Sequence, residues 1–406
     1  MSKNIWIINE YAGNPKYGMT LRHFYLAKEF EKLGWKTNTI SASYSHILDS
    51  YPENKENQNY FDENIEGLDF TWIKVFKYRS SSDYKRILKW FYFSFRLFFV
   101  GRYVKNKPDY ILCSPTAPFC FIPAYYLKWK YKAKIIFEVR DIWPLSLIEI
   151  GSFSKYHPFI LLMRMVELFA IHKADFLVSN LQFYSNYLKE NKIKRTATWI
   201  SNAIYLEELN NTEALNPALE ALLPKAKFIV GYTGKLGLSN AMSYLIEAAK
   251  LIQQEDIYFV IVGNGEEKEK LKAQAKELQN ICFVDAIPKS QIPAILAKFD
   301  LCYIGWNREK LYNYGVSPNK IYDYMYAEKP ILHSIHLQEE LVSLAQCGLR
   351  VEEENPEAIA KGILDLYHLS PEERLVMGKK GKEFVLKNFT YSELAKRYID
   401  LLESTN

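Results

Sequence analysis

Residues 227–265 read KFIVGYTGKLGLSNAMSYLIEAAKLIQQEDIYFVIVGNG, and this stretch decides the fold. An apolar, β-branched run at each end is typical of a buried strand, and the central AMSYLIEAAKLI is typical of an amphipathic helix. Two such strands joined by a helix form the βαβ unit of a parallel sheet. Glycines follow both strands, so we predict loops that allow a close approach of backbone to a ligand.

The same alternation runs through most of the chain. The strand-like runs of the first half are IWII, TNTIS, YILCS, KIIFEV and DFLVSN, and those of the second half continue with NICFVDAIP, DLCYIGW and KPILHS. Helical segments separate these runs, which predicts an α/β protein with two doubly wound, Rossmann-like domains. If the domains face each other, the carboxyl ends of both sheets surround a central cleft, where ligands of such sheets bind.

The length of 406 residues suits about two domains. The stretch IYLEELNNTEALNPALEALLPKA has polar and proline punctuation but no strand pattern, so we predict a linker at 204–225. An N-terminal domain over 1–203 and a C-terminal domain over 226–385 follow. The last segment, 386–406, is predicted to be a helix that packs back on the N-terminal domain.

The composition excludes several classes of protein. With 49% hydrophobic and 24% charged residues, the chain is typical of a globular protein and not of a disordered one. No window has the roughly eighteen uncharged apolar residues needed to span a bilayer, and MSKNIWIINE reads as a first strand and not as a secretion signal. Five cysteines without a C-x-x-C pair indicate free thiols in a reducing cytosol.

The stretch GVSPNKIYDYMYAEKPILHS at 315–334 contains a well-signalled helix start. Ser317 is predicted to be the N-cap and Pro318 the first helical residue. Lys320 then lies in the first turn, where the helix dipole disfavours a lone cation and a bound anion would remove the conflict. Lys320 and the first backbone N–H groups therefore predict a phosphate site, and the alternative is a lysine that points to solvent. Asp323 is the acidic residue near the middle of this stretch.

Two further loops of the second half carry weaker signals. GYTGKLGLSN at 231–240 contains Gly234 and Lys235, and Lys235 is placed to reach a phosphate. The alternative is an ordinary turn with an exposed lysine, because the sequence matches neither of the known glycine-rich nucleotide motifs. The loop VGNGEEKEKL contains Gly263 and Asn264 and, taken alone, is a turn.

In the first half, FEVRDIWP places Arg140, Asp141 and Trp143 just after a strand, at the end where ligands bind. An Arg140–Asp141 ion pair without a ligand is the alternative. NPKYGMTLRH places Gly18 in the first loop and Arg22 and His23 at the start of the next helix.

Residues 84–107 hold seven Lys or Arg residues and no acidic residue. At 100° per residue, Lys85, Lys89 and Arg96 share one stripe, and an apolar stripe that includes Phe91 and Phe95 lies roughly opposite. Such a helix suits an anionic membrane surface. The alternative is a helix that packs on its own domain through its Phe side. Nucleic acid is not expected as a partner, because no recognised module accompanies the charge.

Metal-ligand patterns are weak in this sequence. His333 and His336 are close together but have no acidic or Cys partner at a useful spacing, and no D-x-D pair occurs in the chain. We therefore predict no metal and no cofactor.

Several of these segments, together with SNAI and FVDAIPKSQIPAILAKFDLCYIG, fall in an order that resembles the retaining glycosyltransferases of family 4, which have the two-domain GT-B fold. The similarity covers nearly the whole chain. It is strongest to a bacterial branch with an R-D-x-W-P segment, whose members build O-antigen, capsule or related surface polysaccharides, some with amino-deoxy sugars.

The resemblance implies that the second domain binds a nucleotide sugar, with UDP as the expected nucleotide, and that the first binds the acceptor. Asp323 would contact the ribose, and Lys235 and Lys320 would face the diphosphate. Ile287 and Pro288 would border the base. The other residues expected at the donor are Gly18, Gly234, Gly263, Asn264, Ser317, Pro318 and Asn319. Arg140 and Asp141 would lie near the reacting sugar, and Arg22, His23 and Trp143 on the acceptor side.

The sequence shows three departures from the family pattern. The family has two glutamates separated by seven residues, and here Gly315 and Asp323 stand in their places. Asn240 replaces the usual lysine before the first helix of the second domain, which shifts phosphate binding toward Lys320. Glu328 and Lys329 stand where the family has a glycine.

The expected reaction is a metal-independent sugar transfer that retains the anomeric configuration, to an acceptor on a polyprenyl diphosphate or an oligosaccharide. The protein would act at the cytoplasmic face of the inner membrane. Three alternatives stay open: a nucleotide-sugar epimerase of the same fold, a donor-binding but inactive homologue, and a nicotinamide-dependent oxidoreductase. The last is disfavoured, because no G-x-G-x-x-G turn follows the first strand.

Overall fold

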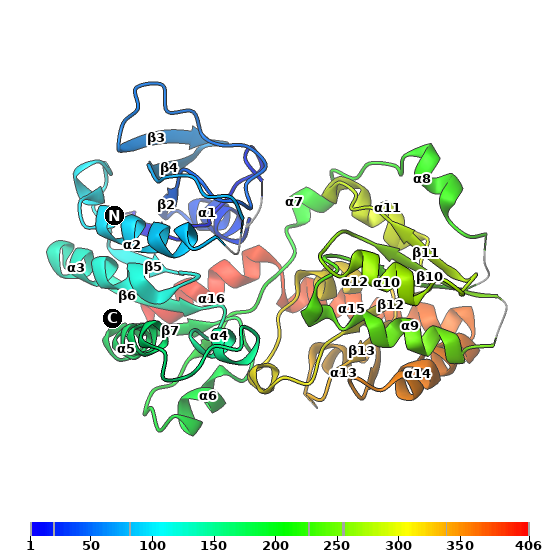
Figure 1. The fold of residues 1–406 in the computed structure, drawn as a ribbon. Coiled ribbons are helices and arrows are strands. Elements are labelled where there is room, and N and C mark those ends of the chain that lie inside the picture. The colour runs from blue at the N-terminus through cyan, green and yellow to red at the C-terminus, as the bar shows by residue number, and fades with distance from the viewer. Residues whose placement is uncertain are drawn as a thin grey trace. The chain divides into compact units, whose positions relative to one another are not determined.

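The structure is a computed structural model that describes residues 2–18, 21–80, 83–225, 228–253, 256–337 and 339–404. The chain divides into two compact units. Unit 1 comprises residues 1–202 and 391–406, and unit 2 comprises residues 203–390 (Figure 1). Each unit is built around its own sheet, and each is described here by itself.

Unit 1 contains eight strands. They are β1 Asn4–Ile8, β2 Lys36–Ala42, β3 Tyr60–Ile65, β4 Leu68–Ile73, β5 Tyr110–Cys113, β6 Lys134–Val139, β7 Phe176–Ser179 and β8 Thr198–Trp199. Its α-helices are α1 Arg22–Lys32, α2 Lys85–Leu97, α3 Phe121–Tyr131, α4 Leu145–Glu149, α5 Pro158–Lys173, α6 Tyr184–Glu190 and α16 Tyr391–Glu403.

The strand order of unit 1 is β3-β4-β2-β1-β5-β6-β7-β8, and all neighbours are parallel except β3 and β4. These two strands form an antiparallel hairpin that our strand prediction missed. Glu66 and Gly67 connect them with φ values of 51° and 87°, and two successive positive φ values are typical of a tight hairpin turn. Strand order reverses between β1 and β5, so the loops after these two strands flank a switch point.

The C-terminal helix α16 belongs to unit 1 and packs against α1. The ring of Tyr398 contacts that of Phe30 at a centroid distance of 5.9 Å, and Tyr391 contacts Tyr25 at 5.1 Å. The predicted helix began at residue 386, but residues up to Asn388 complete α15. Two segments that are far apart in the sequence therefore build one core.

Unit 2 contains six parallel strands and the remaining helices. The strands are β9 Phe228–Thr233, β10 Ile257–Val262, β11 Ile281–Val284, β12 Leu301–Gly305, β13 Ile331–Ser334 and β14 Gly348–Val351. The helices are α7 Leu206–Leu209, α8 Pro217–Leu222, α9 Met242–Leu251, α10 Lys268–Gln274, α11 Ile292–Ala297, α12 Asn319–Tyr326, α13 Leu341–Ala345, α14 Pro356–His368 and α15 Pro371–Asn388. The predicted linker contains α7 and α8, and the chain division assigns it to unit 2.

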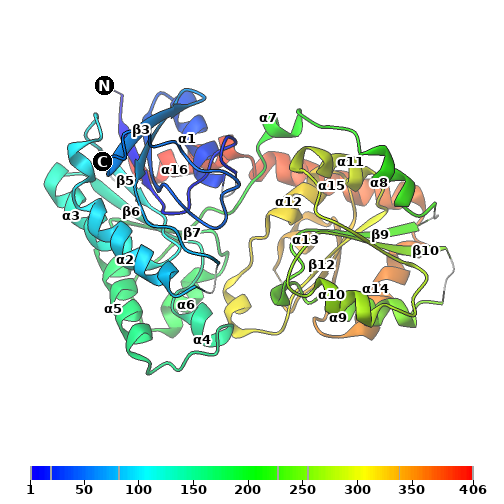
Figure 2. The same ribbon diagram turned by 45° about the horizontal axis from the view of Figure 1, so that its top comes forward.

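The sheet of unit 2 has the order β11-β10-β9-β12-β13-β14. Helices α9, α10 and α14 lie on one face, and α11, α12 and α15 lie on the other (Figure 2). The apolar runs become buried strands because both faces of a parallel sheet are covered. The two doubly wound, Rossmann-like sheets confirm the predicted α/β class, and they place a second switch point between β9 and β12.

Candidate functional site

The switch point of unit 2 brings two loops together. Strand β9 pairs with β10 on one side and with β12 on the other, so the loops after β9 and β12 diverge from one place. Asn307, in the loop after β12, donates a hydrogen bond from Nδ2 to the Leu238 carbonyl oxygen in the loop after β9, at 2.9 Å. Helix α12 begins at the end of the loop after β12. Its N-terminus therefore lies at the carboxyl edge of the sheet, where ligands of such sheets bind.

Lys320, in the first turn of α12, points its ammonium group at the loop after β9. Its Nζ donates to the hydroxyl of Tyr232 at 2.6 Å and to Oδ1 of Asn240 at 2.9 Å. It also lies 4.0 Å from the centroid of the Tyr232 ring. No carboxylate of the described residues pairs with it, and burial lowers its pKa from 10.5 to about 7. A cation in such a place is suited to bind an anion.

Asn240 occupies the position where the family resemblance has a lysine. Its Oδ1 accepts from Lys320, and its Nδ2 donates to the Lys235 carbonyl oxygen at 3.0 Å. The ammonium of Lys320 therefore lies next to the end of the side chain at position 240. This geometry supports the interpretation that Lys320 takes over from the missing lysine. The sequence did not indicate Tyr232 as the second partner of Lys320.

Two glycines allow the loops after β9 and β10 to touch. Gly234 has a φ of 144° and Gly263 a φ of 150°, a backbone conformation that favours glycine. A Cβ on Gly263 would collide with the backbone of Gly234, and a Cβ on Gly234 would lie 3.0 Å from Nζ of Lys320. Gly234 thus lies beside the Lys320 ammonium, and the buried Gly263 packs against the backbone of Gly234.

The other two residues predicted in these loops, Lys235 and Asn264, are both exposed. Lys235 is exposed and pairs with Glu266 at 3.1 Å. Asn264 accepts from the Lys268 ammonium through Oδ1 at 2.7 Å and from the Leu236 backbone N–H through its carbonyl oxygen at 2.9 Å. Asn264 therefore links the loop after β10 to the loop after β9 and to α10.

The start of α12 differs by one residue from the prediction. The helix begins at Asn319, and Pro318 occupies the capping position with φ −73° and ψ 133°. Ser317 makes no cap bond, and its Oγ lies 3.1 Å from the Tyr322 hydroxyl. The proline ring has no N–H and cannot donate, so the first free backbone donors of this helix are those of Asn319 and Lys320.

Asp323 lines a cavity of about 140 Å³ in unit 2. The cavity is bordered by α7, the start of α11 and the side of α12, and Lys289 and Glu208 are its other charged residues. Lys289 pairs with Glu208 at 2.6 Å. Burial raises the pKa of Asp323 from 3.8 to about 6, an effect that Lys289 opposes and Glu208 supports. The predicted base neighbour Ile287 is half-buried in the loop after β11, two residues before Lys289.

Gly315 lies at the end of the 3₁₀ helix η5, Lys310–Tyr314, with φ 105° and ψ 163°. This region is open to glycine almost alone, so a glutamate at this position would be strained. A network that the sequence analysis did not indicate lies next to it: Asn313 contacts His336, and His336 Nδ1 lies 3.2 Å from the buried Glu353. Arg308 donates to the same carboxylate at 2.7 Å.

In unit 1, the structure corrects the roles predicted for Arg22 and His23. Both side chains are buried in the core, and Arg22 pairs with Glu138 at 2.6 Å and donates to the Ile200 carbonyl oxygen at 3.0 Å. Tyr398 of α16 donates to the same Glu138 at 2.6 Å. Burial lowers the pKa of His23 to about 4, so it is neutral at pH 7. These residues hold α1, β6 and α16 together and do not face an acceptor.

Arg140 and Asp141 follow β6, as predicted, but no ion pair of the described residues joins them. Asp141 is exposed, and the protein atoms around it raise the pKa of its carboxyl, an effect that the charge of Arg140 opposes. The Nε of Arg140 is buried without a hydrogen-bond partner in the described part of the chain. Trp143 packs edge-on against Trp90 at 5.9 Å. Gly18 has a φ of 84°, and a Cβ there would collide with Asp49.

Helix α2 shows that one of its predicted membrane-facing residues is buried. Lys89 is fully buried, 3.9 Å from the centroid of the Tyr11 ring, so its assignment to a membrane-facing stripe is wrong. Arg96 is half-buried and donates to the Tyr92 hydroxyl at 2.6 Å. Lys85, Phe91 and Phe95 are exposed. Lys89 lies on the side of the helix that faces the core, together with Trp90 and Phe93.

No group of three or more His, Cys, Asp or Glu side chains in the described part of the chain has the geometry to hold a metal ion. No helix among the described residues is both long and apolar enough to cross a membrane.

The second half of the chain matches a known protein family. Residues 227–368 match the family described as Glycosyl transferases group 1. The matched range contains the switch point, Lys320, Asn240 and Asp323.

Three relatives of the chain are named as glycosyltransferases. The chain is 25% identical over 239 residues to an uncharacterized glycosyltransferase of Methanocaldococcus jannaschii, a match that covers 57% of this chain and 59% of that protein. It is 24% identical over 292 residues to the glycosyltransferase WbjE of Pseudomonas aeruginosa, covering 69% and 72%. WcaI of Escherichia coli, named for colanic acid biosynthesis, is 28% identical over 159 residues, 38% of each chain.

Solved structures match over the whole chain. Sucrose-phosphate synthase of Thermosynechococcus elongatus has a TM-score of 0.73 at 16% identity and 99% coverage of both chains. HepE of Anabaena in complex with UDP-glucose has a TM-score of 0.67 at 12% identity, with 98% and 99% coverage. At these identities the likeness shows the fold alone. These neighbours are GT-B glycosyltransferases, so the predicted GT-B class is confirmed.

Proposed function

We propose that the protein is a glycosyltransferase that moves a sugar from a nucleotide diphosphate to a carbohydrate acceptor. The observation that carries the proposal is the Lys320 ammonium, which lies at the switch point of the range that matches the group 1 glycosyltransferases, with two neutral partners, Tyr232 and Asn240. A diphosphate is the anionic part of such a donor. Its arrival would supply the counter-charge that no described residue supplies.

The chemistry requires that the leaving diphosphate be stabilised as the bond to the sugar breaks. Lys320 supplies one positive charge, and the first backbone N–H groups of α12 point to the same side at the positive end of the helix dipole. The loop at Gly234 lies beside that charge and has no side chain there. Because these groups supply positive charge at the leaving diphosphate, we propose a transfer that needs no metal. Retention of the anomeric configuration is proposed from the resemblance to the retaining family 4 enzymes alone.

Asp323 is proposed to bind the nucleoside. Its carboxyl lines the 140 Å³ cavity beside Lys289, and ribose hydroxyls are good donors to a carboxylate. HepE, a structural neighbour, was solved with UDP and with UDP-glucose, which supports UDP as the first nucleotide to test. Lys235, Asn264, Ile287 and Ser317 stay proposed neighbours of the donor.

The acceptor side is proposed from unit 1. Arg140 and Asp141 lie in the loop after β6, at the carboxyl edge of the sheet, and Asp141 is exposed there. Gly18 remains a proposed diphosphate neighbour. Because WcaI is named for colanic acid biosynthesis, we propose that the acceptor belongs to surface polysaccharide synthesis, on a polyprenyl diphosphate carrier at the inner face of the cell membrane.

A donor-binding but inactive homologue is the second candidate, and Gly315 favours it. The position of the family's first glutamate is a glycine in a conformation that a glutamate would not readily adopt. An epimerase is a third candidate. Incubation of the protein with donor alone and with donor plus acceptor distinguishes the three, since an epimerase changes the donor without an acceptor and an inactive homologue changes nothing.

The direct test is a thermal-shift and calorimetric screen of UDP, uridine and other nucleoside diphosphates. We expect UDP to stabilise the wild type and Lys320→Gln to weaken UDP binding about 10- to 100-fold, the range for losing a hydrogen bond to a charged group. Lys276→Gln, at an exposed lysine of unit 2, is the matched control and should bind as the wild type does.

A second comparison separates the two proposed contacts. Lys320→Gln should leave the weak binding of uridine unchanged, because uridine has no phosphate. Asp323→Ala should weaken uridine and UDP by the same factor. Equal loss of uridine and UDP binding in Lys320→Gln would contradict the assignment of this lysine to the diphosphate.

A further inference from the structure

Unit 1 has a broad apolar surface on the outside of α2, α3 and α5. Helix α2 carries two apolar stripes. Trp90, Phe93 and Leu97 enter the core, and Leu88, Phe91 and Phe95 are exposed on another side at spacings of three and four residues. The inward stripe accounts for the packing of the helix on its own unit. The outward stripe has no such explanation.

The stripe continues onto α3. Ile122, Tyr126 and Trp129 recur at spacings of four and three residues and are all exposed, Trp129 by 77%. The ring of Tyr126 lies 5.5 Å from that of Phe98, which follows α2 directly, so the two helices meet along their outer sides. A tryptophan exposed to this extent is uncommon in a soluble surface without a partner.

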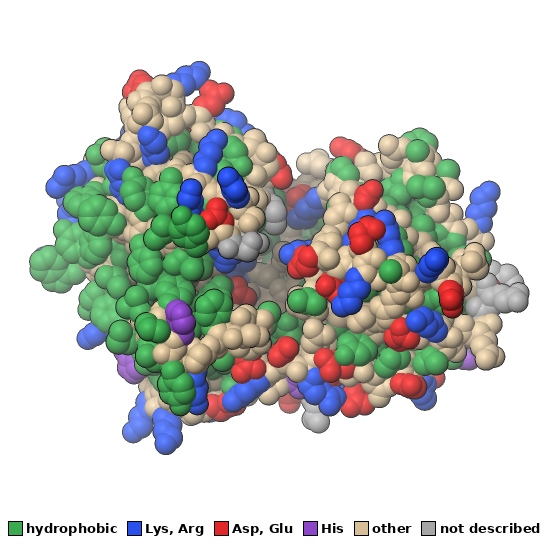
Figure 3. Space-filling view, in the orientation of Figure 1, with side chains coloured by type: hydrophobic (Ala, Val, Ile, Leu, Met, Phe, Trp, Pro, Cys, Tyr) green, Lys and Arg blue, Asp and Glu red, His purple; other side chains and the backbone are tan. Residues whose placement is uncertain are grey.

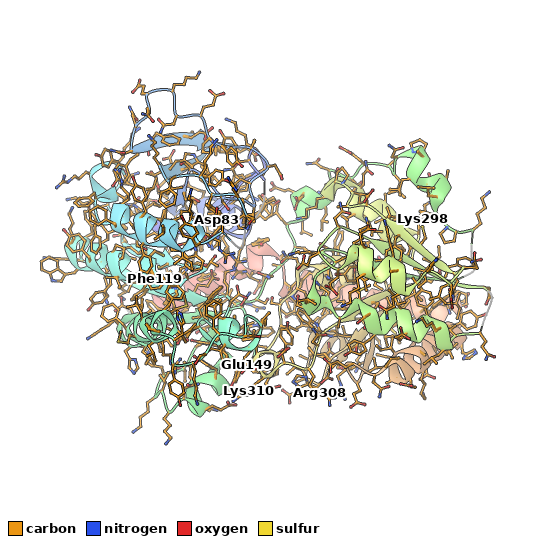
Figure 4. All side chains as sticks on the ribbon, in the orientation of Figure 1. Asp83, Phe119, Glu149, Lys298, Arg308 and Lys310 are labelled. Atoms are coloured by element: carbon orange, nitrogen blue, oxygen red, sulfur yellow. The ribbon has the colours of Figure 1, made fainter. Side chains whose placement is uncertain are left out.

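Helix α5 extends the surface further. Leu161 and Met165 are exposed on it, by 48% and 61%. Phe119, labelled in Figure 4, joins the helices below: its ring lies 4.5 Å from that of Phe91 and 5.8 Å from that of Phe159. On the side of unit 1 that Figure 3 shows, hydrophobic side chains form one wide area over these helices. We refer to the exposed apolar residues of α2, α3 and α5 as the outer face.

Positive charge accompanies the outer face. Residues 84–134, which include α2 and α3, contain eleven Lys or Arg residues and one acidic residue, Asp109, although the whole chain has a net charge of only +5. Lys130 and Lys132 are exposed at the C-terminal end of α3, and Lys105 is exposed in the segment between α2 and β5. Large exposed apolar areas mark interaction sites, and here the partner must also tolerate a concentrated positive charge.

We propose that the outer face docks on an anionic lipid bilayer. Aromatic side chains such as Trp129 and Tyr126 settle at the boundary between headgroups and acyl chains, and lysines beside them attract anionic headgroups. A second copy of this chain is the less suitable occupant, because a symmetric dimer would place this basic region against itself. Phe91 and Phe95, predicted from sequence to face a membrane, belong to the outer face, whereas Lys89 lies in the core.

The position of α2 connects this surface to the proposed function, on which this part of the inference rests. On its inner side, Trp90 donates from Nε1 to the Tyr11 hydroxyl at 3.0 Å, and Tyr11 lies just past the carboxyl end of β1. The same helix thus borders the switch point of unit 1 and the outer face. A lipid-linked acceptor would reach that edge along the helix that docks on the bilayer.

The test is flotation of the full-length protein with vesicles. We expect the wild type to float with vesicles of phosphatidylcholine and phosphatidylglycerol, and less with phosphatidylcholine alone. Phe95→Ser/Trp129→Ser/Met165→Ser should lower vesicle binding at least about tenfold, because three exposed anchors are lost. Leu251→Ser/Leu344→Ser/Leu375→Ser, at three similarly exposed positions of unit 2, is the matched control and should float as the wild type does.

A charge variant gives an independent measurement. Lys105→Gln/Lys130→Gln/Lys132→Gln should lose the preference for phosphatidylglycerol and the sensitivity of binding to salt. A wild type that stays with the pellet, or outer-face variants that float as well as the wild type, would overturn the proposal. So would a wild-type dimer that the Phe95, Trp129 and Met165 substitutions make monomeric without vesicle binding, because the face would then be a self-interface.

The UDP-induced thermal shift is measured on the same samples. A shift that is retained in the outer-face variants shows that unit 2 remains folded, so a loss of flotation then belongs to the surface. If the wild type floats but neither UDP nor any other nucleoside diphosphate of the screen stabilises it, the glycosyltransferase proposal fails and the membrane surface stands.

Discussion

The ammonium group of Lys320 is held in a place that disfavours its charge. Burial lowers its pKa to about 7, and its hydrogen-bond partners Tyr232 and Asn240 are neutral. In the free protein the group therefore loses its proton near neutral pH. A bound diphosphate would raise this pKa again, since an opposite charge favours the protonated form.

This predicts a pH dependence of donor binding. Above pH 7 the free site must take up a proton when the diphosphate binds, so affinity should fall by up to about tenfold per pH unit until the pKa of the bound state is reached. Calorimetry of UDP binding between pH 6 and 9 measures this slope. In Lys320→Gln the slope above pH 7 should disappear, and an unchanged slope would assign the proton to another group.

Gly315 gives a prediction about stability. Its φ of 105° and ψ of 163° lie in a region that costs other residues about 1–3 kcal/mol. Gly315→Ala should therefore lower the unfolding temperature of unit 2 by several degrees. Gly237→Ala is the control, because the φ of Gly237 is −116°. Equal unfolding temperatures for the two variants would show that the backbone at Gly315 relaxes without cost.

At the scale of elements, helix α2 carries a buried lysine, Lys89, that interacts electrostatically with the buried Glu10. Glu10 and Lys89 are both buried, burial raises the pKa of Glu10 to about 7, and burial lowers that of Lys89 to about 8. Each group limits the shift of the other by its charge. Removal of one partner leaves an uncompensated buried group, whereas removal of both leaves none.

A double-mutant cycle tests this coupling. In urea unfolding at pH 8.5, Glu10→Gln and Lys89→Met should each lower the free energy of unfolding by about 1–3 kcal/mol, and the double variant by less than the sum. Without Lys89, the pKa of Glu10 rises further, so Lys89→Met should lose stability as the pH rises from 6.5 to 8.5. Additive effects would show that the two groups do not interact.

Elements were predicted from sequence to different degrees, for physical reasons. Buried parallel strands such as β9 and β10 stand out because both faces are apolar. The β3–β4 hairpin was missed because YFDENIEGLDFTWI alternates polar and apolar residues at one sheet edge, a weaker signal. The position of Lys320 at the start of a helix was predictable from the proline before it, but its contact with Asn240 joins residues eighty positions apart. The burial of Arg22 and Lys89 likewise depends on tertiary partners.

At the scale of the whole molecule, unit 2 is inserted into unit 1. The chain leaves unit 1 after residue 202 and returns at Tyr391 to add α16. The returning helix supplies Tyr398, whose hydroxyl donates to Glu138, the buried carboxylate that also pairs with Arg22. Unit 1 therefore cannot complete its core until the last residues of the chain are present, whereas unit 2 is continuous from 203 to 390.

This topology predicts that the two units respond differently to loss of the C-terminal helix. Deletion of the residues after Thr390 should strongly lower the unfolding temperature of unit 1, because Tyr25, Phe30 and Glu138 lose their α16 partners. Unit 2 should keep its UDP-induced shift, since none of its strands depends on α16. Calorimetry with and without UDP measures both transitions.

Tyr398→Phe, which removes only the hydrogen bond to Glu138, should lower the free energy of unfolding of unit 1 by about 1–3 kcal/mol. If truncation removed the UDP shift while Tyr398→Phe did not, the folding of unit 2 would depend on a completed unit 1, and the independence of the two units would be wrong.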